Sequence, residues 1–218
     1  MDRIDKKSLA PFVAYLFLFH AAWVAWVYLL FPSVRALGER TLTYALVNIG
    51  VRLLVWVLPV LLYLHFVDHV EPIEYLRLKQ RWKRGLQIGL GFTCVNFLLL
   101  MIRFGMPNPH AQSITWNNVL STSLLIGFVE EIPYRGFILQ KLQERLSFWV
   151  ANAISSLLFL AIHLPGWISL HMLSAETFVF VFFFGMLMSI VFRYSGSLWS
   201  AIIAHSLNDF LNAVVFHR

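Results

Sequence analysis

The stretch VLSTSLLIGFVEEIPYRGFIL, residues Val119 to Leu139, has the length and apolar character of a membrane-spanning helix but contains three charged residues. A spanning helix needs about 20 mostly apolar residues. A charge near its centre costs roughly 2.5–3.5 kcal/mol on insertion scales, so such charges are retained mainly where they pair or take part in chemistry. Glu130, Glu131 and Arg135 are therefore the first candidates for a functional site.

The composition of the whole chain is that of a membrane protein. Hydrophobic residues make up 59% of the 218 residues and charged residues only 13%, whereas about 25% of the residues of a soluble domain are charged. We predict an all-α, polytopic transmembrane bundle of about seven spans, with six and eight as the alternatives, forming a single membrane domain over residues 1–218. The predicted spans are Leu9 to Phe31, Thr43 to Phe66, Leu86 to Arg103, Val119 to Leu139, Phe148 to Leu164, Phe178 to Val191 and Leu198 to Phe216.

Basic residues between the spans predict the orientation. With the N-terminus in the cytoplasm, eleven lysines and arginines fall on the inner side and four on the outer side, as the positive-inside rule requires. The inner eleven are Arg3, Lys6, Lys7, Arg77, Lys79, Arg81, Lys83, Arg84, Lys141, Arg145 and Arg193, and the outer four are Arg35, Arg40, Arg103 and Arg218. The net charge of +6 is then explained by topology and anionic lipid, without a nucleic-acid partner.

Four further polar residues interrupt later spans. His163 ends the fifth span, and His205, Asn208 and Asp209 lie in the seventh. At about 100° per helical residue, Asp209 is about 40° from His205 and Asn208 about 60° in the other direction, so all three can face one cavity.

The same geometry separates the two glutamates. Glu131 and Arg135 form an i, i+4 pair in the favoured order, so we interpret them as a structural ion pair. Glu130 points about 100° away and is left without that partner. A different intramembrane charge, Arg52 in the second span, is expected to reach the interface or to pair with an acidic residue.

Three motifs occur in order within apolar spans: EEIPYR at 130–135, FLAIH at 159–163 and HSLND at 205–209. Together they resemble the motif set of the CAAX protease and bacteriocin-processing family, also called the Abi family, of glutamate-type intramembrane endopeptidases. The resemblance covers roughly Val119 to Phe216, and we take 119–216 as the catalytic core.

The resemblance implies that this chain hydrolyses a peptide bond. Glu130 with His163 would activate water, and His205 with Asp209 would stabilise the oxyanion. The commoner form of the last motif has Asn where this chain has Asp209. An ionised Asp accepts hydrogen bonds only, so either protonated Asp209 assists the oxyanion, or it orients His205 and Asn208 is the donor.

The implied partners are membrane lipid and a peptide or protein with a membrane-associated segment: a prenylated tail, a peptide precursor or a membrane-anchored regulator, of which the last two rank above the first. We expect a multi-pass protein of the cell inner or plasma membrane. No cofactor is expected. Zinc is the less favoured alternative, because the chain has no His-Glu-x-x-His helix.

Two other classes of function compete with the protease. In a proton- or ion-coupled transporter, Glu130, His163, His205 and Asp209 would form a relay. The inverted repeats typical of transporters are not apparent in the sequence. A catalytically silent membrane scaffold or immunity protein is the third class, and the intact motif set argues against it.

Overall fold

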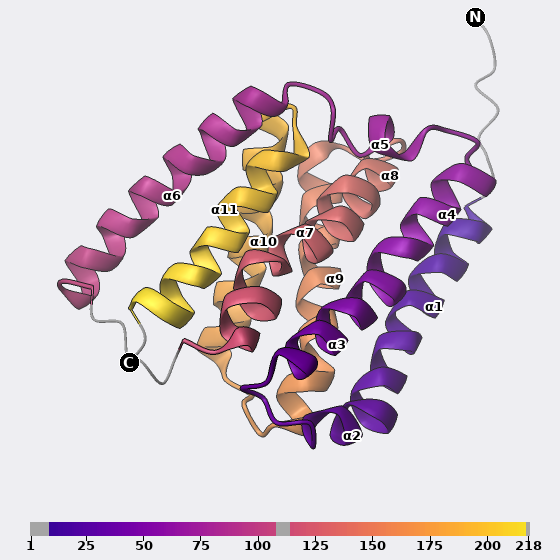
Figure 1. Cartoon of the computed structure of the whole chain (residues 1–218). Helices are drawn as coiled ribbons and strands as arrows, with labels where there is room; N and C mark the ends of the chain where they lie inside the picture. Colours follow the sequence, from indigo (N-terminus) through magenta and orange to yellow (C-terminus); the bar gives the residue numbers. More distant parts are fainter. Residues whose placement is uncertain (1–8, 108–113, 217–218) are drawn as a thin grey trace, which may run out of the picture.

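The structure, a computed structural model, describes residues 9–107 and 114–216, and this part of the chain is helical with no strand (Figure 1). The predicted all-α fold class is confirmed. The helical segments are α1 Ala10–Ala25, η1 Trp26–Leu30, α2 Phe31–Arg35, α3 Leu42–Arg52, η2 Leu53–Val57, α4 Leu58–Phe66, α5 Pro72–Tyr75, α6 Trp82–Phe104, η3 Asn117–Leu124, α7 Ile126–Glu131, η4 Ile132–Leu139, α8 Gln140–Gln143, α9 Phe148–Ser169, α10 Ala175–Ser195, α11 Leu198–Phe210 and η5 Leu211–Val215, where η marks wider π-helical turns.

Five helices of the described part are long and apolar enough to cross a membrane. They are Ala10–Arg35, Leu42–Phe66, Trp82–Phe104, Phe148–Ser169 and Ala175–Ser195. They coincide with the first, second, third, fifth and sixth predicted spans and extend past at least one predicted end. The two other predicted spans carry the first and the last of the three motifs. The protein is an integral membrane protein.

The predicted span Val119 to Leu139 is helical but not uniform. Its helix begins at Asn117, passes through a turn at Leu125 and ends at Gln143. The π-helical segment η4 includes Pro133, and η1 and η2 directly precede the turns that contain Pro32 and Pro59. Proline cannot donate the usual i to i−4 hydrogen bond and its ring crowds the preceding turn, so a wider turn accommodates it.

Glycines allow α6 and α7 to pack closely against α11. A Cβ at Gly127 would lie 2.5 Å from Ser206 Oγ and 2.6 Å from the Ile202 carbonyl oxygen. At Gly89 it would lie 3.0 Å from the Ser200 carbonyl oxygen. Without a hydrophobic force between helices in lipid, small residues at such crossings supply the close packing. This packing places the last motif helix directly beside the glutamates of α7.

The basic segments predicted to share one side of the membrane do meet at one end of the bundle. Arg84 donates to the Tyr194 carbonyl at 3.1 Å, and Leu198 N donates to the Arg77 carbonyl at 3.3 Å. Figure 1 shows α5 and α8 at this end and α2 at the opposite end. Of the residues in the orientation prediction, Arg3, Lys6, Lys7 and Arg218 lie outside the described residues.

An ion pair joins the loop before α5 to α8 at this basic end. Lys141 Nζ lies 2.8 Å from Asp68 Oδ2 and 3.0 Å from Glu144 Oε1. Burial alone would lower the pKa of Lys141, but the hydrogen bonds to Asp68 and Glu144 outweigh it and raise that pKa. The loop before α5 is thereby held to the end of α8.

Candidate active site

The two glutamates of α7 are buried in the bundle and have different surroundings. Glu131 is fully buried, and its Oε1 accepts a hydrogen bond from Arg135 NH1 at 3.1 Å. Arg135 NH2 also donates to the Gly185 carbonyl of α10 at 2.9 Å. The i, i+4 pair expected from the sequence is thus formed, and Arg135 connects it to a second helix. The other carboxylate oxygen, Glu131 Oε2, is buried and has no hydrogen-bond partner among the described residues.

His205 of α11 lies between three acidic side chains. Its Nδ1 is 2.7 Å from Glu131 Oε1, while its Nε2 is 3.5 Å from Asp209 Oδ2 and 3.8 Å from Glu130 Oε2. Since a carboxylate accepts hydrogen bonds, Nδ1 carries the proton shared with an ionised Glu131. Glu131 therefore positions the imidazole as well as pairing with Arg135. Only the Nε2 edge is left to face Glu130 and a reacting group.

Aromatic rings form a wall beside this cluster. The Phe159 ring lies 4.3 Å from the Arg135 guanidinium carbon and 6.0 Å from the His205 ring. The ring of Phe184 in α10 also lies 5.0 Å from the His205 ring. These rings exclude water from part of the site, and an apolar enclosure strengthens the electrostatic interactions inside it.

The structure does not bring His163 into contact with Glu130. Its Nδ1 lies 2.8 Å from the carbonyl oxygen of Phe159, one turn earlier in α9, and its ring packs 4.9 Å from Phe159 and 5.3 Å from Trp167. No ion pair or hydrogen bond joins the described side chains of His163 and Glu130. The Phe159 ring is near both imidazoles, with centroids 4.9 Å from His163 and 6.0 Å from His205.

The side-chain amide of Asn208 forms hydrogen bonds with Asp209 and with two other asparagines. Its Nδ2 donates to Asp209 Oδ1 at 2.8 Å, and its Oδ1 accepts from Asn96 of α6 at 3.1 Å and from Asn212 at 3.3 Å. Asn208 thus bridges α6 and α11, and one of its two amide hydrogens is already used by Asp209. The Asp209 side chain is 30% exposed and faces His205 with its other oxygen.

Arg52 is a further charged residue near the site, and the sequence did not predict its contacts. NH1 donates to the Ser121 carbonyl at 2.6 Å, and the guanidinium lies 6.0 Å and 5.7 Å from the rings of Trp23 and Trp56. Its charge acts on Glu130 and Asp209. The position of Arg52 in an apolar span marked it as unusual in the sequence. No neighbouring residue in the sequence indicated that it would lie near α7 or α11.

The same side chains include types that can ligate a metal ion. Among residues 9–107 and 114–216, no three His, Cys, Asp or Glu side chains converge as ligands. His205 Nδ1 is committed to Glu131. In this arrangement the described residues do not fit a metal centre.

Residues 112–211 match the family model described as Rce1-like, type II CAAX prenyl endopeptidase. The match is consistent with the resemblance of this chain to the CAAX protease family. The match spans all three motifs of the sequence, and it supports intramembrane endopeptidase activity on a membrane-associated peptide or protein. Comparison with curated proteins and with solved structures gives no match.

The matched region, residues 112–211, includes most of the residues around His205 but not all of them. Arg52 and Asn96 precede residue 112 and contribute to the site from α3 and α6. The N-terminal helices of this chain therefore complete the surroundings of the motif residues.

Proposed function

We propose that this protein is a glutamate-type intramembrane endopeptidase that hydrolyses a peptide bond of a membrane-associated peptide or protein. The observation that carries the proposal is the position of His205, whose two ring nitrogens face Glu131 and Glu130 at 2.7 Å and 3.8 Å. Two carboxylates and an imidazole in a buried setting supply a base and a donor beside the same reacting atom.

Glu130 is proposed as the general base. It is 96% buried, and unlike Glu131 it has no arginine pair within its own helix. The 3.8 Å between Glu130 Oε2 and His205 Nε2 is too long for a direct hydrogen bond. A water molecule in contact with both groups would be held by the imidazole and deprotonated by the carboxylate. His163, which shares the Phe159 wall, is proposed to contact the substrate or that water.

His205 is proposed to stabilise the oxyanion. With the Nδ1 proton directed at Glu131, only the imidazolium form keeps a proton on Nε2 for donation. Asp209 accepts hydrogen bonds and lies 3.5 Å from that nitrogen, so we assign it as a positioning residue for His205. Asn208 is assigned the weaker role of holding Asp209 in place.

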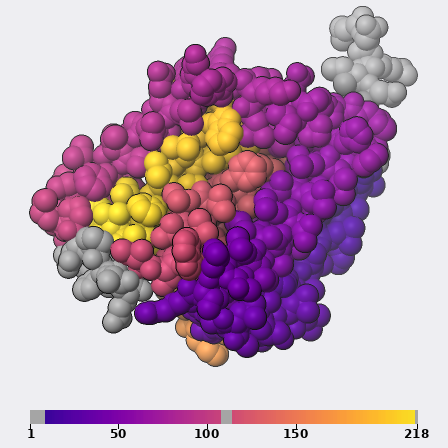
Figure 2. All heavy atoms as spheres, viewed as in Figure 1, coloured from indigo at the N-terminus to yellow at the C-terminus, as the bar shows by residue number. Residues whose placement is uncertain are grey.

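Substrate is proposed to enter from the lipid. Atoms of α11 and of the α7 region reach the surface between α6 on one side and α3 and α4 on the other (Figure 2). A peptide with an apolar anchor could approach the site there without leaving the membrane. As substrate, a peptide precursor or a membrane-anchored regulator ranks above a prenylated tail. We propose that the protein lies in the cell inner or plasma membrane with its N-terminus in the cytoplasm.

The test replaces Glu130 by Gln, which keeps the shape and removes the base. Purified protein in vesicles is given two internally quenched peptides, one with a farnesylated cysteine and one with only an apolar anchor. We expect Glu130→Gln to lose roughly 100- to 10,000-fold in turnover, the usual contribution of a general base. The matched control is Glu39→Gln at an exposed position, which should cleave normally.

Normal cleavage by Glu130→Gln would refute the assignment of the base. If neither peptide is cleaved by the unmodified protein, but the vesicles show proton flux that Glu130→Gln abolishes, the transporter alternative replaces the protease.

A further inference from the structure

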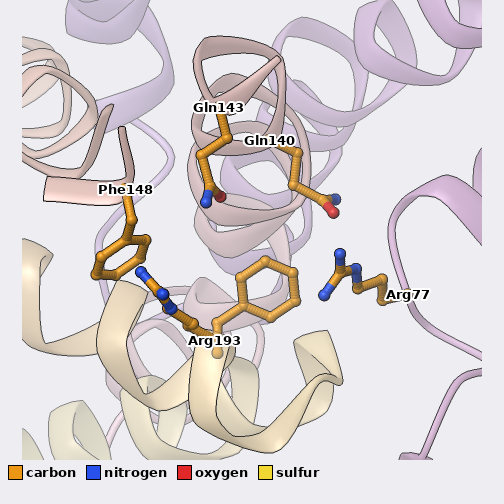
Figure 3. Close-up of a pocket in the computed structure, with 6 residues that line it drawn as sticks. Arg77, Gln140, Gln143, Phe148 and Arg193 are labelled. Carbon is orange, nitrogen blue, oxygen red and sulfur yellow. The ribbon is translucent and has the colours of Figure 1, made fainter. Parts of the chain in front are cut away.

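A polar cavity lies at the basic end of the bundle, and neither glutamate of α7 lines it. It has a volume of about 370 Å³ and is lined by Arg77, Gln140, Gln143, Phe148, Phe192 and Arg193. This size is within the range of roughly 300–1,000 Å³ found for small-molecule sites. Figure 3 shows the two glutamines descending from one helix, with Arg77 on one side and Arg193 and Phe148 on the other.

The two arginines of this cavity are not neutralised by the protein. Among the residues that the structure describes, neither guanidinium forms an ion pair or a hydrogen bond. Each lies over an aromatic ring instead, Arg77 at 5.6 Å from Phe192 and Arg193 at 4.1 Å from Phe148. Stacked guanidinium groups keep their hydrogen-bond donors free at the edge and match the oxygens of a phosphate.

The backbone holds Arg77 in an unfavourable conformation. Its φ is +55°, in the left-handed region that costs a non-glycine residue roughly 1–2 kcal/mol. Its carbonyl oxygen is fixed by Leu198 N at 3.3 Å and by Ser197 Oγ at 3.5 Å. Strain of this kind persists only where surrounding contacts impose it, and it is often found at binding sites.

Gln140 adds a polar group of fixed direction. Its Nε2 donates to the carbonyls of Tyr75 at 2.8 Å and Gly136 at 2.6 Å, so its Oε1 is the atom free to accept. An acceptor beside two arginines suits an anion that also carries a hydroxyl donor. It suits a phosphate that carries hydroxyl groups.

Exposed aromatic and apolar side chains flank the cavity. Trp149 and Tyr194, which follow Phe148 and Arg193 in the chain, are 61% and 69% exposed, and Val150 is 48% exposed. Tryptophan and tyrosine at helix ends are typical of the membrane interface. A ligand in the cavity would therefore have its polar part among the arginines and an apolar surface beside it.

We propose that this cavity binds the headgroup of an anionic phospholipid whose phosphate is esterified to a hydroxyl-bearing group such as glycerol. Arg77 and Arg193 bind the phosphate, Gln140 and Gln143 bind the hydroxyls, and the acyl chains lie along the exposed face of α9. The bound lipid joins α8 to α10 at the interface, as the hydrogen bond from Arg135 to Gly185 joins η4 to α10 within the membrane. The proposal does not depend on the proposed proteolysis.

The test measures lipid-dependent stability of the purified full chain in detergent. The probes are short-chain phosphatidylglycerol, phosphatidylcholine of the same chain length, and inorganic phosphate. We expect phosphatidylglycerol to raise the thermal midpoint, with no comparable effect of the other two. Arg77→Gln/Arg193→Gln should bind it at least about tenfold more weakly, because charge-assisted hydrogen bonds are lost. The matched control, Lys79→Gln/Lys83→Gln, removes the same charge outside the cavity and should bind normally.

Three results would overturn the proposal. Equal losses in the two double variants would mean that diffuse charge at this end attracts the lipid. An equal effect of inorganic phosphate would assign the cavity to a soluble anion, and an equal effect of phosphatidylcholine would show that anionic charge is not recognised. If the arginine double variant does not fold, the single change Arg193→Gln at an exposed position gives the same comparison.

Discussion

Replacing Arg135 by Ala should destabilise the fold strongly, because the arginine has a buried partner on each side. The side chain is only 1% exposed, and it donates to Glu131 at 3.1 Å and to the Gly185 carbonyl at 2.9 Å. Its loss leaves the Gly185 carbonyl without this donor and Glu131 without a neutralising cation. Removing one half of a buried ion pair typically costs about 3–5 kcal/mol.

We expect a value near the lower limit, about 3 kcal/mol, because Glu131 keeps its 2.7 Å contact with His205. For a chain of this size that loss corresponds to a fall of about 6–12 °C in the thermal midpoint. The assay is thermal unfolding of the purified variants in one detergent. The control is Arg35→Ala, which breaks the i, i+4 pair with Glu39 where both side chains are about half exposed. It should cost less than about 1 kcal/mol.

A double variant separates stranded charge from lost packing. If the uncompensated Glu131 carboxylate causes most of the loss, adding Glu131→Gln to Arg135→Ala should recover part of the midpoint, since a Gln oxygen can still accept from His205. An Arg135→Ala midpoint equal to that of Arg35→Ala would refute the reasoning. No recovery in the double variant would assign the loss to packing against Phe159.

Two further changes test the helix packing and the last motif. Gly127→Ala should lower the thermal midpoint, because its Cβ would come within 2.6 Å of a backbone oxygen of α11, whereas Gly91→Ala, with no atom within 4 Å, should not. A midpoint unchanged by Gly127→Ala would show that α7 and α11 can separate at little cost. Asp209→Asn should keep measurable peptide cleavage, because Asn can still orient His205, whereas His205→Ala should lose roughly 100- to 1,000-fold in turnover. Inactive Asp209→Asn would mean that the carboxylate charge itself is required.

Local features of the site could be read directly from the sequence. The Glu131–Arg135 pair was predictable because residues four apart in a helix are neighbours whatever the rest of the fold does. The polytopic all-α class was likewise predictable, because lipid leaves an apolar chain of this length few ways to satisfy its backbone hydrogen bonds. The order of the three motifs indicated the CAAX protease family for the same reason: it needs only linear spacing.

The spacing of residues along the sequence could not predict contacts between distant segments. Glu130 was expected to act with His163, but the tertiary packing brings it near His205 and places Phe159 beside both histidines. The role of Arg52 beside Ser121 also depended on how α3 packs against η3. Each of these contacts depends on which face of a helix is turned towards its neighbours. The apolar pattern does not predict this face, because lipid-facing and buried positions are both apolar in a membrane protein.

The sequence by itself thus determined that the protein lies in a membrane, where most of its helices lie along the chain, the ion pair within one helix and the residue types available for chemistry. The tertiary structure alone decided which acid faces each nitrogen of His205, and it brought Arg77, Gln140 and Arg193 to one cavity from three separate segments. The physical reason is that helix periodicity is fixed by local backbone hydrogen bonds, whereas the rotation and approach of helices are fixed by small contacts such as those of Gly127 and Gly89 with α11.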